Sequence, residues 1–167
     1  RPILLKDISD HALKQTPTIE QVVVFKRNDT PCQMTAGRDV WYHELMAQSA
    51  HAGMHNSTWT AKGRPAGGAS EVIRAAKFYM ASQVESGHLC PITMTRASVA
   101  ALAEQPDLLA KVMPVLGTRA YDPAFAPWWT KRGMTRGMGM TEKQGGPDVR
   151  SNKTWAENDG DGYRITG

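Results

Sequence analysis

The chain has 167 residues, of which 41% are hydrophobic and 22% are charged, and its formal net charge is +4 at pH 7. These values are ordinary for a soluble globular chain that buries a core. No run of about 18 apolar residues occurs, so we expect no membrane span. The two cysteines make no metal-binding spacing. Two thiols in a chain of this size favour a reducing compartment, so we expect an intracellular protein, cytoplasmic or mitochondrial.

Residues 1–36 are predicted to form an irregular, extended N-terminal arm. Within it, residues 21–25 are apolar and mostly β-branched, which is typical of a short strand. The same run could instead pack against a helical body as part of the extended arm.

Residues 37–130 are predicted to be helical. Apolar residues recur at three- and four-residue steps over 38–60 and predict a helix there. His51 and His55 lie one turn apart on it. A zinc site is disfavoured, because Ala52 stands where a zinc-protease motif carries its acid and no third ligand is evident. We therefore interpret both histidines as packing or surface residues.

The clearest predicted helix covers residues 70–86. Ser70 can cap its N-terminus, Glu71 suits the first turn, and Gly87 ends it. One apolar stripe runs along this helix and is predicted to be core. The stripe consists of Val72, Ala76, Met80 and Val84.

Residues 63–68, which precede this helix, are rich in glycine and proline and are predicted to be a loop. Two more helical stretches follow the helix. Residues 97–103 favour a helix, and residues 106–112 favour a short helix that is broken at Pro114. Residues 121–130 are predicted to be an irregular connector. Its adjacent tryptophans indicate packing, with a base-stacking platform as the weaker alternative.

Residues 133–141 are predicted to be a strand, and residues 142–147 the turn that leaves it. The paired glycines of this turn allow several backbone N–H groups to point together, which suits a phosphate or an electron-rich ligand edge. A plain β-turn with a charged rim is the alternative. The glycine spacing fits neither a P-loop nor a dinucleotide fingerprint.

The positive charge is concentrated around this turn. Residues 131–150 carry five basic and two acidic side chains, a local charge of +3. Such a rim suits an anionic dinucleotide or coenzyme A phosphate. It would also suit nucleic acid, although no basic stripe with interleaved aromatic residues appears, and a simple solvated face is the third possibility.

Residues 152–157 and 163–167 are predicted to be two strands joined by a polar turn at 158–162. A calcium loop is disfavoured there, because the twelve-residue pattern with its terminal glutamate is absent.

The turn resembles the motif of the acyl-CoA dehydrogenase family. In that motif a small residue, an apolar residue and Thr or Ser precede Glu, and a small residue, Gly, a hydroxyl residue and Asp follow after two variable positions. Only Pro147 departs from it, since it stands at the hydroxyl position. The matching residues are Gly139, Met140, Thr141, Glu142, Gly145, Gly146 and Asp148. The sequence of residues 137–152 is most similar to the AidB-like, alkylation-response branch of this family.

This resemblance implies a mainly α fold, in which the helical N-terminal domain of the acyl-CoA dehydrogenase fold is followed by the first strands of its β-domain. The implied division is an arm at 1–36, a helical domain at 37–130 and a truncated β-domain at 131–167. The resemblance also implies a fragment, because the family's catalytic carboxylate and its C-terminal bundle would lie after residue 167. We expect the fragment alone to be inactive.

The implied cofactor is FAD, bound by the motif through the Thr141 hydroxyl and by backbone N–H groups. Glu142 and Asp148 are interpreted as structural acids that fix the turn through neighbouring N–H groups. No catalytic residue and no metal ligand is assigned in this chain. The predicted cofactor-binding residues are Met138, Gly139, Met140, Thr141, Glu142, Lys143, Gln144, Gly145, Gly146 and Pro147.

Two functions are implied. The first is α,β-dehydrogenation of an acyl-CoA thioester with hydride transfer to flavin N5, in a homo-oligomer, expected to be a tetramer, when the protein is full length. The second is an AidB-like role in DNA binding or protection, with DNA contacted only through C-terminal regions that this chain does not include.

Overall fold

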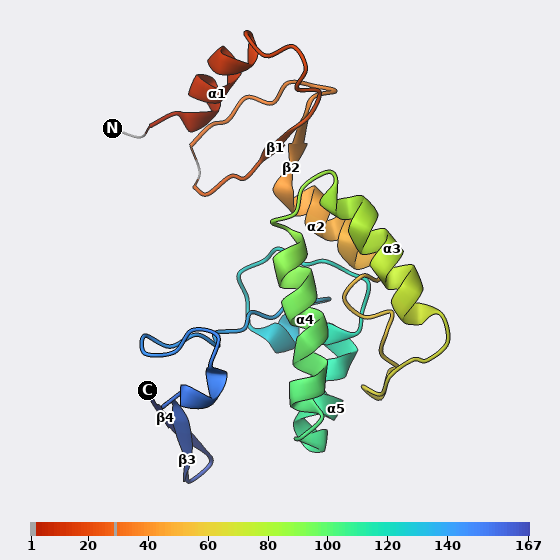
Figure 1. Ribbon diagram of the computed structural model, residues 1–167, viewed down its shortest axis with the longest axis vertical. Coiled ribbons are helices and arrows are strands. Elements are labelled where there is room, and N and C mark those ends of the chain that lie inside the picture. The colour runs from red at the N-terminus through yellow and green to blue at the C-terminus, as the bar shows by residue number, and fades with distance from the viewer. Residues whose placement is uncertain (1–2, 29) are drawn as a thin grey trace. The chain divides into compact units, whose positions relative to one another are not determined.

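A computed structural model describes residues 3–28 and 30–167 of the chain, which divide into two compact units, Arg1–Gly137 and Met138–Gly167. The first unit is mainly helical, as the sequence predicts (Figure 1). Its helices are α1 (Leu5–Leu13), α2 (Tyr42–His51), α3 (Ser70–Ser82), α4 (Leu89–Leu102) and α5 (Pro106–Leu116). Among the described residues, no helix has the length and apolar character needed to cross a bilayer.

Each unit contains one small two-stranded sheet. In the first unit, β1 (Val22–Val24) pairs in parallel with β2 (Asp39–Trp41). In the second unit, β3 (Trp155–Asp159) pairs with β4 (Gly162–Thr166) as an antiparallel hairpin, which confirms the predicted pair of strands. The hairpin reverses at Gly160, whose φ of +70° favours glycine.

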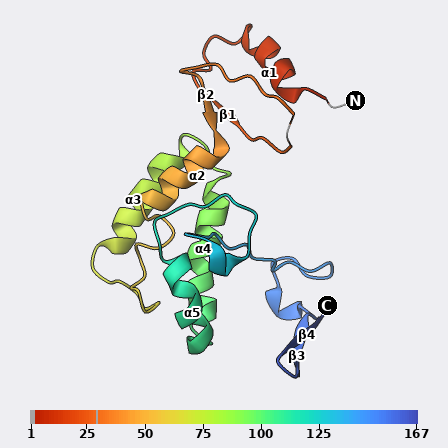
Figure 2. The same ribbon diagram turned by 180° about the vertical axis from the view of Figure 1, so that it is seen from behind.

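Two apolar clusters pack helices of the first unit, other than α1, against one another. One joins α4 to α5, which lie side by side (Figure 2). The partly buried Trp128 packs against this cluster. The other joins α2 and its following turn to α4 and includes Ile92, whose side chain is fully buried. The first cluster contains Val99, Leu102, Leu109, Val112, Met113 and Leu116, and the second contains Met46, Met54, Leu89 and Ile92.

The predicted apolar stripe of α3 is not core. Val72 is 72% exposed and Met80 is 62% exposed. The opposite side of the helix faces the turn after α2, because Arg74 Nε donates to the Met54 carbonyl at 2.8 Å and Lys77 Nζ donates to the Ala52 carbonyl at 2.9 Å. The prediction was wrong because long cationic side chains can satisfy carbonyl groups at a helix end while their stems pack against it.

The ends of α3 also differ from the prediction. The N-cap position belongs to Ala69, and Ser70 Oγ instead donates to the Gly67 carbonyl at 2.8 Å. The helix ends at Ser82, several residues before Gly87. A side-chain oxygen that has already found a local carbonyl partner no longer caps the helix.

Three other predicted boundaries are corrected. The arm at 1–36 is not irregular throughout, since it contains α1, whereas β1 confirms the strand considered for residues 21–25. The helix predicted over 38–60 is shortened by β2 at its start and by turns after His51. Pro114 lies inside α5 and does not break it. Its missing N–H costs one helical hydrogen bond, but the residues around it are buried in the first cluster.

The predicted strand at 133–141 does not form. This segment has no regular secondary structure and pairs with no strand among the described residues. A strand exists only when a neighbour accepts and donates its ladder hydrogen bonds, and local β-propensity does not supply that neighbour.

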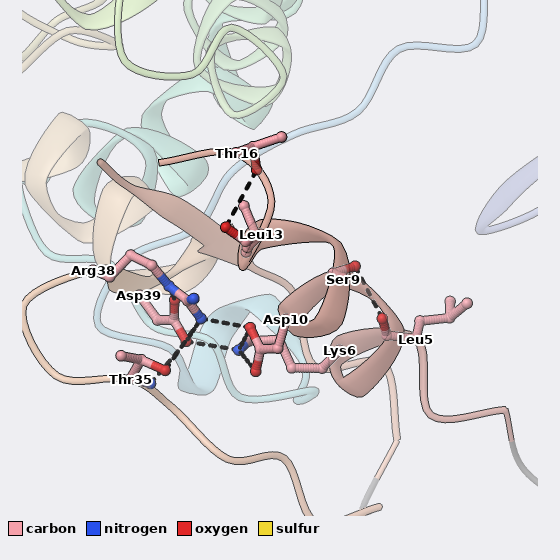
Figure 3. Close-up of polar contacts among 9 residues, drawn as sticks. All are labelled: Leu5, Lys6, Ser9, Asp10, Leu13, Thr16, Thr35, Arg38 and Asp39. Atoms are coloured by element: carbon pink, nitrogen blue, oxygen red, sulfur yellow. Dashed lines mark hydrogen bonds and ion pairs between the residues drawn. The ribbon is translucent and has the colours of Figure 1, made fainter. Parts of the chain in front are cut away.

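A cluster of ion pairs ties α1 to the start of β2 (Figure 3). Lys6 Nζ lies 2.7 Å from Asp39 Oδ2, and Arg38 Nε lies 2.6 Å from Asp39 Oδ1. Lys6 and Arg38 both also contact Asp10 on α1. The hydrogen bond from Arg38 is the largest of the effects that hold the pKa of Asp39 well below its ordinary value.

Candidate cofactor-binding turn

The carboxylate of Glu142 organises the turn that follows residues 138–141. It accepts hydrogen bonds from the backbone N–H of Lys153 at 2.6 Å and of Thr154 at 2.8 Å, and also from the Gln144 side chain. The Glu142 carbonyl accepts from the N–H of Gly145 at 3.1 Å, which closes the turn itself. One side chain thus joins the turn to the start of the β3–β4 hairpin.

These contacts keep Glu142 ionised. The N–H of Lys153 is the largest cause, followed by Thr154, and together with Gln144 they lower the pKa of Glu142 from an ordinary 4.5 to about 2. A carboxylate that accepts several N–H groups is stabilised in its charged form. The side chain is therefore anionic and fully engaged at neutral pH, so it is a structural group and not a proton carrier.

Asp148 and Asn152 secure the other side of the turn. The Asp148 side chain accepts from the N–H of Arg150 at 3.3 Å, and its carbonyl accepts from Ser151 Oγ at 2.7 Å. Asn152 Nδ2 donates to the Met140 carbonyl at 2.7 Å. The prediction that the two acids fix the turn through neighbouring N–H groups is confirmed for Asp148, which bonds to the N–H of Arg150 two positions away. Glu142 differs, because it bonds to N–H groups eleven and twelve positions away at the start of the hairpin.

The ten predicted cofactor-binding residues lie together in this one exposed segment. Thr141 is exposed, and within the described part of the chain its hydroxyl forms no hydrogen bond. A Cβ placed at Gly139 or Gly146 would meet nothing within 4 Å, so the surface beside the turn is open. A free hydroxyl and an open stretch of backbone suit the oxygen and nitrogen atoms of a flavin ring edge. Pro147 contributes neither a hydroxyl nor an N–H there.

Asn152 is the structural residue of the turn that sequence reasoning missed. It bonds to the main-chain carbonyl of Met140, twelve positions away. No sequence spacing marks such a bond, because any residue at position 140 would offer the same carbonyl.

The two histidines considered for zinc do not form a metal site. His51 is the last residue of α2, whereas His55 lies in the following turn, where it is buried and donates from Nε2 to the Thr118 carbonyl at 2.8 Å. Burial is the main cause that lowers the pKa of His55. Among residues 3–28 and 30–167, no group of three side chains of the kinds that bind metals comes together.

Comparison with known proteins decides the family. Residues 39–123 match the family described as the Adaptive response protein AidB N-terminal domain. AidB of Escherichia coli (strain K12), whose name assigns it to the acyl-CoA dehydrogenases, is 43% identical over 129 residues. The chain belongs to the AidB family. The match to the Escherichia coli AidB protein covers 75% of this chain and 23% of that relative, so this AidB-family chain spans about a quarter of its length.

A second group of relatives matches a shorter stretch. The acetyl-coenzyme A synthetase of Coprinopsis cinerea is 48% identical over 48 residues, which are 29% of this chain and 7% of that enzyme. The corresponding enzyme of Rubrobacter xylanophilus is 49% identical over 45 residues, or 27% of this chain and 7% of the enzyme. These matches show a shared segment, whereas the AidB match covers three quarters of the chain.

Proposed function

We propose that this chain is the N-terminal part of an FAD-dependent, AidB-like flavoprotein that dehydrogenates an acyl-CoA thioester between its α and β carbons. The observation that carries this proposal is the turn at Thr141 and Glu142, which is held by hydrogen bonds to the Glu142 carboxylate, within a chain of the AidB family. The catalytic carboxylate that removes the α-proton would come from a part of the protein outside this chain. An acyl-CoA substrate, a homo-tetramer and a location in the bacterial cytoplasm belong to the same proposal. The name of the Escherichia coli relative supports the acyl-CoA substrate.

The residues of the turn would bind one edge of the flavin. FAD, when bound, supplies the acceptor for the substrate hydride. Negative charge grows at the N1–C2=O2 edge of a ring that accepts hydride. The Thr141 hydroxyl and the backbone N–H groups of residues 138–146 would stabilise it, apart from the N–H of Gly145, which donates to the Glu142 carbonyl. Glu142 holds those groups in place without contacting the ring, because its own oxygen atoms are occupied by Lys153 and Thr154.

The sequence on either side of the turn is basic, which would suit the phosphates of both proposed ligands. The local charge of +3 over residues 131–150 attracts a dinucleotide or coenzyme A. The names of both groups of relatives refer to coenzyme A thioesters, which supports this substrate class.

A chimera tests the proposal. Residues 131–167 of this chain would replace the matching segment of the Escherichia coli relative, and the purified chimera should carry flavin absorbance. Thr141→Val in this chimera should weaken FAD binding about 5- to 30-fold, the equivalent of one or two kcal/mol for a lost hydrogen bond to a charged group. Thr135→Val, which changes an exposed threonine outside the turn, is the matched control.

The outcome is read from flavin affinity and reduction potential. A Thr141→Val chimera with the affinity and potential of the unmodified chimera would remove Thr141 from the site. A Pro147→Ser chimera should bind FAD or acyl-CoA more tightly, because serine restores a hydroxyl and an N–H together.

The second candidate function is the DNA-related role of the AidB-like branch, and the basic rim is the observation that favours it. We expect that this chain alone does not retard duplex DNA near physiological salt, because DNA contact would come from regions outside it. A shift by the chain alone that weakens steeply as salt is raised would assign the charge of residues 131–150 to DNA and not to the cofactor.

A further inference from the structure

Three polar side chains in the helical unit form a continuous hydrogen-bonded chain. His88 Nδ1 lies 3.0 Å from Glu85 Oε2, and His88 Nε2 lies 3.0 Å from Ser49 Oγ. The carboxylate only accepts, so Nδ1 carries the ring proton and Nε2 accepts the Ser49 hydroxyl. Ser49 and His88 are each 2% exposed. The order carboxylate, imidazole and hydroxyl is that of a nucleophile with its base and an orienting acid.

Glu85 is fixed independently of the histidine ring. Its carboxylate also accepts from the backbone N–H of Gly87 and from that of His88 at 2.8 Å. Burial raises the pKa of Glu85, but these N–H groups and the His88 ring outweigh burial and leave the pKa below its ordinary value. The acid therefore stays charged and holds the imidazole in one tautomer and orientation.

A cavity of about 460 Å³ opens onto Ser49 and His88. Its volume lies in the range of small-molecule sites, which combine apolar walls with a few polar groups. Lys77 also lines it and, among the described residues, is its one basic side chain apart from His88. The walls are built mainly by Val40, Leu45, Met54, Met80, Ala81 and Val84. Two members of the apolar stripe that the sequence predicts to be core, Met80 on α3 and Val84 just after this helix, therefore line the cavity.

We propose that this cavity is an acyl-transfer site, in which Ser49 is the nucleophile, His88 the general base and Glu85 a positioning residue, and which hydrolyses esters or thioesters of short apolar acyl groups. The apolar walls would hold the acyl chain, and the Lys77 ammonium would face the negative charge that develops on the carbonyl oxygen. This activity is separate from the proposed dehydrogenation and uses none of its residues.

The steps balance without an oxidant or a metal. Ser49 Oγ bonds to the acyl carbon while its proton passes to His88 Nε2, and His88 then gives this proton to the departing alkoxide or thiolate. Water next bonds to the acyl carbon and gives a proton to His88, which returns it to Ser49 Oγ as the acyl–serine bond breaks. The sum is ester or thioester plus water, which yields a carboxylic acid plus an alcohol or a thiol.

The decisive experiment treats the purified chain with a fluorophosphonate probe and follows hydrolysis of p-nitrophenyl butyrate and of the butyryl thioester of N-acetylcysteamine. The probe should attach to Ser49, as located by peptide mass spectrometry. Ser49→Ala should lower hydrolysis about 100-fold or more, the scale of a lost nucleophile–base pair. Ser86→Ala, at an exposed serine before α4, should hydrolyse as the unmodified chain does. The two substrates decide whether the site prefers oxygen esters or thioesters.

Exposed imidazoles hydrolyse activated esters slowly, so His88→Gln is compared with His51→Gln, whose parent residue is exposed. Only His88→Gln should lose the activity. Glu85→Gln should lower the rate and Glu85→Asp should restore part of it, because only the second keeps a charged acceptor for Nδ1. Met80→Trp changes an exposed residue at the cavity and should slow hydrolysis while helix content and thermal midpoint are retained.

Two results would overturn the proposal. One is an unmodified, folded chain that neither reacts with the probe at Ser49 nor hydrolyses either substrate. The other is a folded Ser49→Ala variant that hydrolyses both as fast as the unmodified chain. The probe needs no variant, so the first result is decisive even if a substitution at the buried serine impairs folding.

Discussion

Two valines on neighbouring helices offer a direct test of the fold, because the same substitution should destabilise the chain at one position and hardly change its stability at the other. Val99 on α4 is 3% exposed and belongs to the α4–α5 cluster, whereas Val72 on α3 is 72% exposed. The apolar pattern of the sequence predicts that Val72 is buried in the core, whereas the structure exposes it. Comparing the two variants therefore shows which of the two descriptions of α3 is correct. The perturbation is alanine at each position in turn.

The magnitude follows from what each side chain buries. Val99→Ala removes two methyl groups from the core, at about 0.8 kcal/mol each. The cavity left behind adds about 1 kcal/mol, and the higher helix propensity of alanine returns about 0.5 kcal/mol. The free energy of unfolding should therefore fall by about 2 kcal/mol. At Val72 the small buried part and the gain in propensity nearly cancel, so the change should stay within about 0.5 kcal/mol.

The assay is thermal and urea unfolding followed by circular dichroism at 222 nm, which reports the helices of the first unit. A loss of 2 kcal/mol should lower the midpoint temperature of Val99→Ala by about 4–8 °C in a chain of this size. The midpoint of Val72→Ala should hardly move. If Val72→Ala costs as much as Val99→Ala, then α3 buries its apolar stripe and the packing described for this helix is refuted.

Three further outcomes are expected. Because the folded-state pKa of Glu142 is lowered to about 2, the stability that its ionised carboxylate gives the turn is complete above the ordinary pKa of 4.5 and is lost as the pH falls toward 2. The NMR amide signals of Lys153 and Thr154 should shift with this titration, and signals that do not change with pH would contradict their hydrogen bonds to Glu142. Asp39→Asn should speed amide hydrogen exchange in α1 and leave exchange in α4 and α5 unchanged, since the ion pairs join only α1 to β2; equal exchange in α1 would show that the cluster does not hold that helix. Gly63→Ala should destabilise the first unit by more than about 1 kcal/mol, because φ is +70° and the new Cβ would lie 2.6 Å from a leucine side chain; an unchanged urea midpoint would contradict this geometry.

Local sequence signals predicted those elements whose hydrogen bonds are satisfied close by along the chain. The β3–β4 hairpin is an example, because Gly160 and a polar turn bring two β-prone runs together within a few residues. Asp148 is a second example, because it bonds to the N–H of Arg150 two positions away. The partners of Glu142 lie eleven and twelve positions along the chain, at a distance that no sequence spacing marks. The strand predicted at 133–141 failed for the opposite reason, because its partner would have to come from elsewhere in the fold.

The sequence by itself determined the helical character of the first unit, the terminal hairpin and the motif that identifies the family. Only the tertiary structure decided which side of α3 is buried, because Arg74 and Lys77 reach carbonyl groups that no periodicity reveals. It also brought Ser49 and His88, 39 positions apart, into one hydrogen bond beside a cavity. Periodicity shows how a helix divides its side chains between two faces, but which face is buried depends on the partners that the rest of the chain presents.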